Sequence, residues 1–450
     1  MPAPITPPPK LRMAVVGGGI GGLCLALALS KHSDIQVDVY EAAEQLKEIG
    51  AGVIFWERTW EVFRSMGLSD DLTEVSGAPI DPKPSVGFDY FRSDSPNAGH
   101  QFAQFKPPCK LLGLTKRLLH AEIILQDGCI RFHRAHFLDV LIKHLPEGIA
   151  HLKKRLLSYE DTDHGITLNF ADGTTASADL LVGCDGIKSV VRKQMYEAEA
   201  AKGDPKLLQF IDPVWSGTMI YRALAPAERL FEACNGRRHR IMDDAAVYCG
   251  KNKHIVSYAV GKGATTVNIV AFATNPEDEG KTYDGPWVTG CSADEVRNHF
   301  VDQPLVWALH CLKPLPFYTK GQVTLLGDAA HAMLPHQGVG AVQAIEDAYL
   351  LAGLLGDAAV TKDTLQHALH AYEATRLPFA NARMAGSRMN GLMYEFNSEH
   401  GDNYETLAPA ITSQWNWQWE NTAEDEVQKA LLLMRGRIKT MPVASRGSNQ

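Results

Sequence analysis

The stretch AVVGGGIGGL, residues 14–23, decides the fold of this chain. It begins within a short apolar strand expected over 13–16 and runs into an Ala/Leu-rich helix that reaches about residue 30. Its G-x-G-x-x-G glycines are Gly17, Gly19 and Gly22. The first permits a tight turn, the second lets a pyrophosphate approach the backbone, and the third lets helix and strand pack closely. We therefore predict a dinucleotide-binding turn, with the anion at the helix N-terminus.

An acidic residue follows the next predicted strand. The alternating run 36–40 reads as a strand, and Glu41 comes directly after it. A carboxylate in this place accepts hydrogen bonds from the 2′-hydroxyl of an adenosine ribose and repels a 2′-phosphate. The turn is thus predicted to hold FAD or NAD rather than NADP.

The rest of the chain alternates between two kinds of sequence. An apolar strand at 180–183 follows a hairpin around Asp172-Gly173, and a strand over 322–326 runs into a helix at 341–355. Between them, strand-rich runs without helices indicate an antiparallel sheet. Helical sequence then covers about 364–396, where Pro378 predicts a kink or break.

These patterns predict an α/β protein. A Rossmann-like domain is built from discontinuous sequence, a β-rich substrate domain is inserted into it, and a helical segment follows. The predicted parts are a disordered leader at 1–10, the nucleotide domain at 11–195 and 317–375, the β-rich domain at about 196–316, and the C-terminal helical segment at 376–450.

Composition excludes several classes of partner. The 450 residues carry 44 basic and 52 acidic side chains, a net charge of −8, which argues against a nucleic-acid platform. The 8 cysteines show no zinc-ligand or C-x-x-C spacing, so no metal site is expected. No segment is long and apolar enough to cross a membrane. We expect a cytoplasmic enzyme with a small-molecule substrate; its oligomeric state stays open.

Two further motifs carry a family resemblance. CDGIKSVVR, residues 184–192, has the form D-G-x-x-S-x-V-R, and LLGDAAHAMLPHQGVG, residues 325–340, places Gly-Asp after a strand and a proline before a glycine turn. With the first motif, they resemble the class A FAD-dependent aromatic hydroxylases. The stretches EIGAGV, HRAHFLDVL, YRAL, GKNKHIVSYAV and YEATRLP are similar to the salicylate hydroxylase branch.

The resemblance implies a set of cofactor contacts. It implies tightly bound FAD, with Asp328 on the ribityl chain and Arg134 at the pyrophosphate or ribityl region. It places residues 50–53, including Gly52 and Val53, near the flavin. The remaining residues expected at the cofactor are Asp185, Pro335, Gly338 and Gly340. Where relatives have small residues, this chain has Val339 and Val342, which predict a stiffer turn or a narrower pocket.

Candidate substrate groups come from the β-rich domain and from the turn at 335–340, which the resemblance places beside the flavin and which is called the flavin turn below. Arg222 has the fork geometry to pair with a carboxylate or phenolate, whereas Tyr221 should point to the opposite face of its strand. His336 follows Pro335 and is a candidate proton donor or relay, with a structural imidazole as the alternative. His254 and Tyr258 share one strand face and are weaker substrate candidates.

Other conspicuous side chains are expected to be structural. His331 is expected to pack near the flavin diphosphate or to cap local backbone. Trp415, Trp417 and Trp419 are expected to pack the C-terminal segment.

The predicted activity is that of an FAD-dependent monooxygenase using NADH or NADPH and O2. The family reaction proceeds through a flavin C4a-hydroperoxide and hydroxylates a phenolic acid of the salicylate or 4-hydroxybenzoate type, with or without loss of the carboxylate. One alternative is a hydroxylase of a larger phenol that does not decarboxylate. The other is an FAD-binding redox sensor that does not oxygenate.

Overall fold

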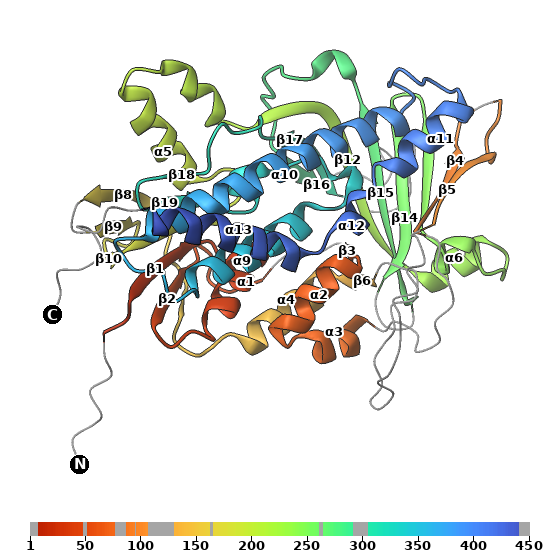
Figure 1. Cartoon of the computed structure of the whole chain (residues 1–450). Helices are drawn as coiled ribbons and strands as arrows, with labels where there is room; N and C mark the ends of the chain where they lie inside the picture. Colours follow the sequence, from red (N-terminus) through yellow and green to blue (C-terminus); the bar gives the residue numbers. More distant parts are fainter. Residues whose placement is uncertain are drawn as a thin grey trace.

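The computed structural model describes residues 8–47, 52–76, 87–94, 96–106, 130–162, 165–260, 264–290 and 305–440. A nucleotide-binding sheet with its helices occupies one side of the molecule, and a larger sheet occupies the other (Figure 1). The long helix α10 runs across both (Figure 1). Predictions for 1–7, for Gly50 and Ala51, and for 441–450 lie outside the described residues.

A six-stranded sheet forms the nucleotide-binding part, in the order β18-β19-β11-β1-β2-β7. Its pairs are parallel except for β18 with β19. The strands are β1 (Leu11–Val16), β2 (Ile35–Tyr40), β7 (Ala150–His151), β11 (Leu180–Gly183), β18 (Thr319–Lys320) and β19 (Val323–Leu325). Because neighbouring strands come from distant parts of the chain, the discontinuous Rossmann-like architecture is confirmed.

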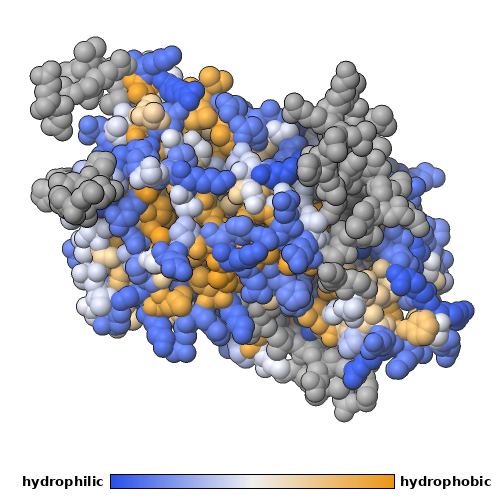
Figure 2. Space-filling model, turned by 90° about the horizontal axis from the view of Figure 1, so that it is seen from below, coloured by the Kyte–Doolittle hydropathy of each residue, from blue (hydrophilic) through white to orange (hydrophobic). Residues whose placement is uncertain are grey.

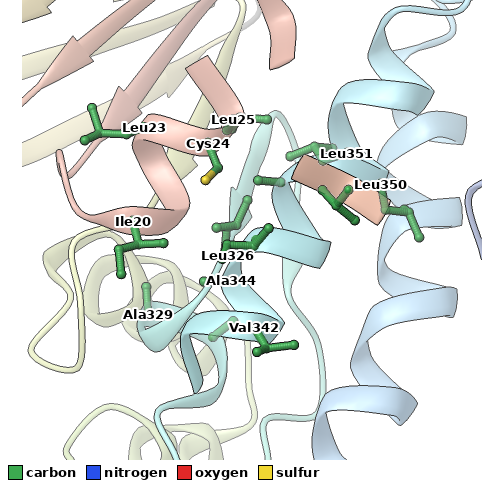
Figure 3. Close-up of a cluster of buried hydrophobic side chains, with 14 of the residues drawn as sticks. Ile20, Leu23, Cys24, Leu25, Leu326, Ala329, Val342, Ala344, Leu350 and Leu351 are labelled. Atoms are coloured by element: carbon green, nitrogen blue, oxygen red, sulfur yellow. The ribbon is translucent and has the colours of Figure 1, made fainter. Parts of the chain in front are cut away.

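Apolar helices cover this sheet. The helix α1 (Ile20–Leu29) packs against α9 (Gly340–Leu355) in a layer that includes Cys24, Leu326, Ala344 and Leu351 (Figure 3). Nine of the ten α1 residues are buried, which explains why its sequence is apolar on every side. The other helices near this part are α2 (Glu57–Met66), α3 (Ser69–Ser76), α4 (Arg134–His144), α5 (Val190–Ala201), α8 (Asp328–His331) and the 3-10 turns η1 (Pro205–Phe210) and η5 (Pro335–Gln337).

The second layer is an eight-stranded sheet, in the order β16-β17-β12-β15-β14-β13-β4-β5. Its strands are β4 (Phe88–Arg92), β5 (Gln101–Phe105), β12 (Val214–Pro226), β13 (Ala246–Gly250), β14 (Lys253–Val260), β15 (Thr266–Thr274), β16 (Val288–Gly290) and β17 (Leu305–Cys311). The predicted β-rich segment 196–316 omits β4 and β5, which precede it by a hundred residues and join the sheet through a parallel pair of β4 with β13. Local patterning carries no information on such a long-range pairing.

A small sheet, a two-stranded ribbon and several short helices complete the fold. The predicted hairpin around Asp172-Gly173 is present as β9 (Gly165–Phe170) and β10 (Thr175–Ala178), with β8 (Leu156–Thr162) beside it. A two-stranded ribbon pairs β3 (Gly52–Phe55) with β6 (Ile130–His133). The β-rich side also contains α6 (Ala227–Ala233), η2 (Arg240–Met242) and η4 (Pro276–Asp278).

The C-terminal helices tie the two layers together. α10 (Leu365–Tyr394) continues through Pro378 for 30 residues, so of the kink or break expected there the break is wrong. The predicted boundary at 375/376 falls inside this helix. Extensive packing offsets the hydrogen bond that proline removes. After it come α11 (Tyr404–Ser413), which packs on β5, α12 (Trp417–Glu420) and α13 (Ala423–Lys439), which packs on α9 and α10.

The surface carries both hydrophilic and hydrophobic residues. On the face shown in Figure 2, hydrophilic residues surround separate hydrophobic patches. The most exposed large apolar side chains of the described residues belong to different elements: Leu432 of α13 is 71% exposed, Leu157 of β8 is 60% exposed and Phe231 of α6 is 51% exposed. Among the described helices, none combines the length and apolar character needed to span a bilayer.

Candidate functional site

The glycine turn brings three backbone segments into contact. Gly17 has φ +111°, and a Cβ built on it would lie 2.2 Å from the carbonyl oxygen of Cys184. A Cβ on Gly22 would lie 2.0 Å from the carbonyl oxygen of Gly17. Side chains at these positions are therefore sterically excluded. Gly19 is the N-cap of α1 and provides no capping side chain, which leaves the helix N-terminus available to an anion.

Glu41 lies beside this turn, as the sequence predicted. Its carboxylate accepts hydrogen bonds from the backbone N–H of Gly18 at 2.7 Å and of Ala43 at 2.8 Å. These two bonds fix the carboxylate at the end of β2. A ribose hydroxyl at the turn would meet an oriented acceptor.

The D-G motif braces the loop rather than presenting its aspartate. Asp185 accepts hydrogen bonds from the Ser189 hydroxyl at 2.5 Å and the Val190 N–H at 2.7 Å, at the start of α5. Burial raises the pKa of this carboxyl group. Arg192 is buried and donates to the carbonyl oxygens of Ala329 and Ile211. The motif thus connects the D-G loop to α8.

The third motif supplies an exposed acid. Gly327, at φ +64°, is the N-cap of α8, and Asp328 is the first residue of that helix. The Asp328 side chain is exposed and lines a cavity. In the part of the chain that the structure describes, its carboxylate makes no hydrogen bond, so it is available to an external donor.

A cavity of about 520 Å³ lies between the three motifs and one face of the large sheet. Most of the residues predicted at the cofactor line it: Gly19, Gly52, Val53, Arg134, Asp328, Pro335, Gly338 and Gly340. Gly17, Gly22, Glu41 and Asp185 are not among the lining residues. The first three support the glycine turn at its edge, and Asp185 faces α5.

The opposite wall is one face of the large sheet. Arg222 of β12, Tyr258 of β14 and Asn268 of β15 line the cavity, and Tyr258 is in register with Asn268. Arg222 is two register positions away, opposite Val270. Tyr221 does not line the cavity, as the alternation of strand side chains predicts.

The two candidate histidines lie one behind the other. His336 lines the cavity from η5 and is 8% exposed. His254 is 1% exposed and lies behind it, with ring centroids 5.2 Å apart. Burial first, and His254 second, lower the pKa of His336 well below its usual range. The ring at the cavity is therefore neutral at neutral pH.

Comparison with known proteins identifies the family. A family model described as "FAD binding domain" matches residues 315–387, and one described as "NAD(P)-binding Rossmann-like domain" matches residues 15–46. A salicylate hydroxylase of Pseudomonas putida is 36% identical over 443 residues, which cover 95% of this chain and 95% of the relative. The chain belongs to the class A FAD-dependent aromatic hydroxylases, in the salicylate hydroxylase-like branch.

Two further relatives place the hydroxylase within this branch. A 6-methylsalicylate 1-monooxygenase of Aspergillus terreus is 30% identical, with 94% of this chain and 92% of the relative covered. A solved salicylate hydroxylase substrate complex has a TM-score of 0.77 and 31% identity, covering 93% of this chain and 98% of that one. The hydroxylase uses FAD, electrons from NADH or NADPH, and O2 to oxygenate an aromatic ring.

A buried ionic network lies next to α8, the helix that carries Asp328. Arg376 of α10 donates to Asp347 at 2.7 Å and to Glu426 at 2.8 Å. Arg58 of α2 donates to Glu346 at 2.8 Å and to Glu426 at 2.7 Å. Four helices, α2, α9, α10 and α13, therefore meet through these charges.

His331 is part of that network. Its Nε2 lies 2.6 Å from Asp347, which also accepts the backbone N–H of Gly327 at 3.1 Å. His331 is fully buried and does not line the cavity. It supports the turn that carries Asp328, instead of capping the backbone directly.

Acid should weaken this support. Burial raises the pKa of Asp347, but the positive charges of His331 and Arg376 lower it by more than burial raises it. The resulting pKa is about 2, against an ordinary 3.8. A depressed pKa stabilises the fold above pH 3.8, and this contribution is lost as the pH falls toward 2. We expect Asp347→Asn to lower the free energy of unfolding by about 2 kcal/mol at pH 7. Between pH 3.8 and 2 the free energy of unfolding of the variant should change less with pH than that of the wild type, as measured by denaturant unfolding. Parallel profiles for the variant and the wild type would contradict this assignment; exposed Asp363→Asn is the control.

Sequence reasoning missed several residues of the hydroxylase cavity. Asn268 is 1% exposed, lines the cavity, and has no hydrogen-bond partner for either side-chain polar atom among the described residues. Its only signal was a polar residue in the apolar run TVNIVAFA. Trp415 packs on Trp56, with ring centroids 5.3 Å apart, and both line the cavity. Trp415 is 1% exposed and packs in the core, as expected, and it also forms part of the cavity wall.

The two unusual valines do not narrow the cavity. Val339 is 1% exposed and Val342 is fully buried, and neither is a lining residue. Val342 packs in the apolar layer between α1 and α9 (Figure 3). The expected narrowing is wrong because both side chains point into the core.

Proposed function

We propose that this hydroxylase converts salicylate or a close ring-substituted relative to the corresponding catechol with release of carbon dioxide. The observation that carries the proposal is the cavity wall, where Arg222, Asn268 and Tyr258 lie on one sheet face and His336 lies on the flavin turn. This arrangement offers a cation for the carboxylate and a neutral imidazole for the phenol. The similarity to salicylate hydroxylases supports the choice of acid.

The proposed reaction balances without a further reactant. Salicylate, NAD(P)H, O2 and two protons give catechol, carbon dioxide, water and NAD(P)+. A carbon–oxygen bond forms at the ring carbon that carries the carboxylate, and the bond from that carbon to the carboxylate breaks. FAD, when bound, accepts the hydride and activates O2.

The protein holds the two partners and excludes water. In our proposal Arg222 binds the carboxylate, Asn268 and Tyr258 orient the ring, and His336 accepts the phenolic proton. The aromatic lining from Trp56, Trp307 and Trp415 limits access of water to the reacting carbon.

The cavity also fits the proposed FAD contacts. The glycine turn receives the pyrophosphate, and Glu41 accepts from the ribose hydroxyl. Asp328 accepts from the ribityl hydroxyls. Residues proposed along the ring system or the diphosphate are Gly52, Val53, Arg134, Pro335, Gly338 and Gly340.

Asp328→Ala should weaken FAD binding about tenfold or more, because a charged acceptor is lost from a preformed site. Dialysis followed by flavin fluorescence measures the dissociation constant. Asp328→Asn, which keeps an oxygen acceptor, should lose less. Exposed Asp363→Ala should retain the wild-type affinity. Equal flavin occupancy in Asp328→Ala and wild type would overturn the ribityl assignment.

Product analysis tests the reaction itself. The purified protein is incubated with O2, NADH or NADPH, and either salicylate or 4-hydroxybenzoate. Catechol with one carbon dioxide per catechol supports the proposal. A dihydroxybenzoate that keeps its carboxylate would remove the decarboxylation. Failure of both acids to stimulate NAD(P)H oxidation would overturn the proposal and direct the search to larger phenols.

A further inference from the structure

A buried carboxylate lies behind the two histidines of the cavity. Glu395, the C-cap of α10, is 2% exposed. Its Oε1 lies 3.0 Å from Nδ1 of His254 and accepts the hydroxyl of Thr274 at 2.8 Å. Thr274 is in turn 2.9 Å from the hydroxyl of Thr218 on the next strand. A polar chain therefore extends from the cavity wall into the protein.

Among the described residues, an imidazole is the group that pairs with this carboxylate. Within the described ranges, neither lysine nor arginine forms an ion pair with Glu395, and its ion pair is with His254. Burying an unpaired carboxylate is costly, and the contact with Nδ1 of His254 supplies the partner. That contact leaves Nε2 of His254 on the side of the ring away from the carboxylate. A neutral glutamine would satisfy the same hydrogen bonds at lower cost, and the charge therefore requires an explanation.

The two imidazoles are arranged for exchange of a proton. His254 stacks on Phe272 with ring centroids 4.1 Å apart and planes 9° apart, which fixes its orientation. In the described part of the chain, Nε2 of His254 and Nδ1 of His336 are buried without a hydrogen-bond partner. At a centroid separation of 5.2 Å, a rotation of one ring or one bridging water joins these atoms.

A glycine keeps the space for the outer ring. A Cβ on Gly391 of α10 would lie 2.6 Å from Nε2 and Cδ2 of His336. Any larger residue there would displace the ring from the cavity wall. The same helix thus positions His336 through Gly391 and supplies Glu395 one turn later.

We propose that His336, His254 and Glu395 form a relay that removes the phenolic proton of the bound substrate, with Glu395 as the positioning residue that orients His254 and balances the proton it receives. This inference rests on the proposed function. The phenolic O–H bond breaks and an N–H bond forms on His336. His336 gives its other proton to Nε2 of His254, and the resulting imidazolium is paired with the carboxylate. The net result is a phenolate in the cavity and a compensated charge inside the protein.

Several other ionisable groups lie around the relay. They are Cys249 of β13, Tyr90 and Arg92 of β4, Tyr394 of α10, and Lys251 between β13 and β14. Burial raises the pKa of the Cys249 thiol and of both tyrosines, so these groups remain neutral. Arg92 pairs with Asp94, and Lys251 donates to the carbonyl oxygen of Phe396. The buried thiol and tyrosines are therefore neutral, and both cations already have partners.

Glu395→Gln tests the relay without removing its hydrogen-bonding shape. The probe is 5-nitrosalicylate, whose phenolate absorbs differently from its phenol, bound to the oxidised FAD-loaded enzyme and titrated with base. Without the negative charge, a proton that reaches His254 is no longer balanced by a carboxylate, and the phenol keeps its proton to higher pH. We expect the apparent pKa of the bound phenol to rise by about one unit, a tenfold change in the ionisation constant. Salicylate-dependent NADH oxidation at neutral pH should fall by a similar factor, with unchanged flavin content.

Matched variants separate the relay from a structural role. Glu395→Asp keeps the charge and should recover part of the shift, whereas exposed Glu399→Gln should titrate as wild type. If Glu395→Gln fails to retain FAD, His254→Gln interrupts the same path and must show the same rise. A wild-type titration curve in the flavin-loaded glutamine variant overturns the relay, even when salicylate is turned over. Absence of turnover by the wild type would instead overturn the proposed function.

Discussion

Arg376→Met should destabilise the hydroxylase by about 3–5 kcal/mol, because breaking a buried ion pair leaves its partners uncompensated. The Arg376 side chain is fully buried and bonds to Asp347, Glu346 and Glu426. Methionine fills a similar volume but donates no hydrogen bond. In the variant, Arg58 is then the one arginine among the described residues that is paired with Glu346 and Glu426, which two arginines balance in the wild type. Equilibrium unfolding in urea, followed by tryptophan fluorescence, measures the loss.

The same helix provides a control for this experiment. Arg388 of α10 pairs with Glu279 at 2.6 Å, but its side chain is 48% exposed. Surface ion pairs of this kind contribute about 0–1 kcal/mol. Arg388→Met should therefore change the free energy of unfolding little. Equal losses in the two variants would show that the buried network does not have the assigned importance.

Arg222→Met should weaken salicylate binding by about a hundredfold while FAD content stays unchanged. The predicted loss of about 3 kcal/mol follows from removing the cation that faces a desolvated carboxylate. Arg222 lines the cavity, and its guanidinium lies 5.7 Å from the centre of the Trp307 ring, which restricts its position. Perturbation of the flavin spectrum on titration with salicylate gives the dissociation constant.

A neutral ligand separates charge recognition from general damage to the cavity. Salicylamide keeps the phenol and the ring but has no negative charge. Its affinity should change much less than that of salicylate in Arg222→Met, and exposed Arg229→Met on α6 should leave both affinities unchanged. Equal weakening of the two ligands would assign Arg222 to the shape of the cavity rather than to the carboxylate.

The sequence was sufficient for the elements whose signal is local. The glycine spacing at 17, 19 and 22 predicted the strand, turn and helix of the Rossmann-like part, and alternation predicted the strands of the large sheet. It did not place β4 and β5 in that sheet, because pairing across more than a hundred residues leaves no local pattern. The break expected at Pro378 failed because packing of α10 against its neighbours overrides local propensity.

The site was predictable where a motif names the residue. Asp328 and His336 belong to a stretch with family resemblance, and both line the cavity. Asn268 and Glu395 belong to no motif. Their importance depends on burial and on which side chains meet across β14, β15 and α10. Such meetings are set by tertiary packing and could not be derived from spacing along the chain.

The order of strands in the six-stranded sheet has a consequence for synthesis of the protein. β11 lies between β1 and β19, so β11 can pair along both of its edges only after residue 325 has left the ribosome. Pairing over such long loops is slow, because the entropy cost of closing the loop is incurred before the contacts that offset it have formed. A nascent chain that ends before Asp328 already carries the glycine turn, Gly52, Val53 and Arg134, but it lacks Asp328 and the turn at 335–340. We therefore expect FAD to be captured late, after about three-quarters of the chain has been translated.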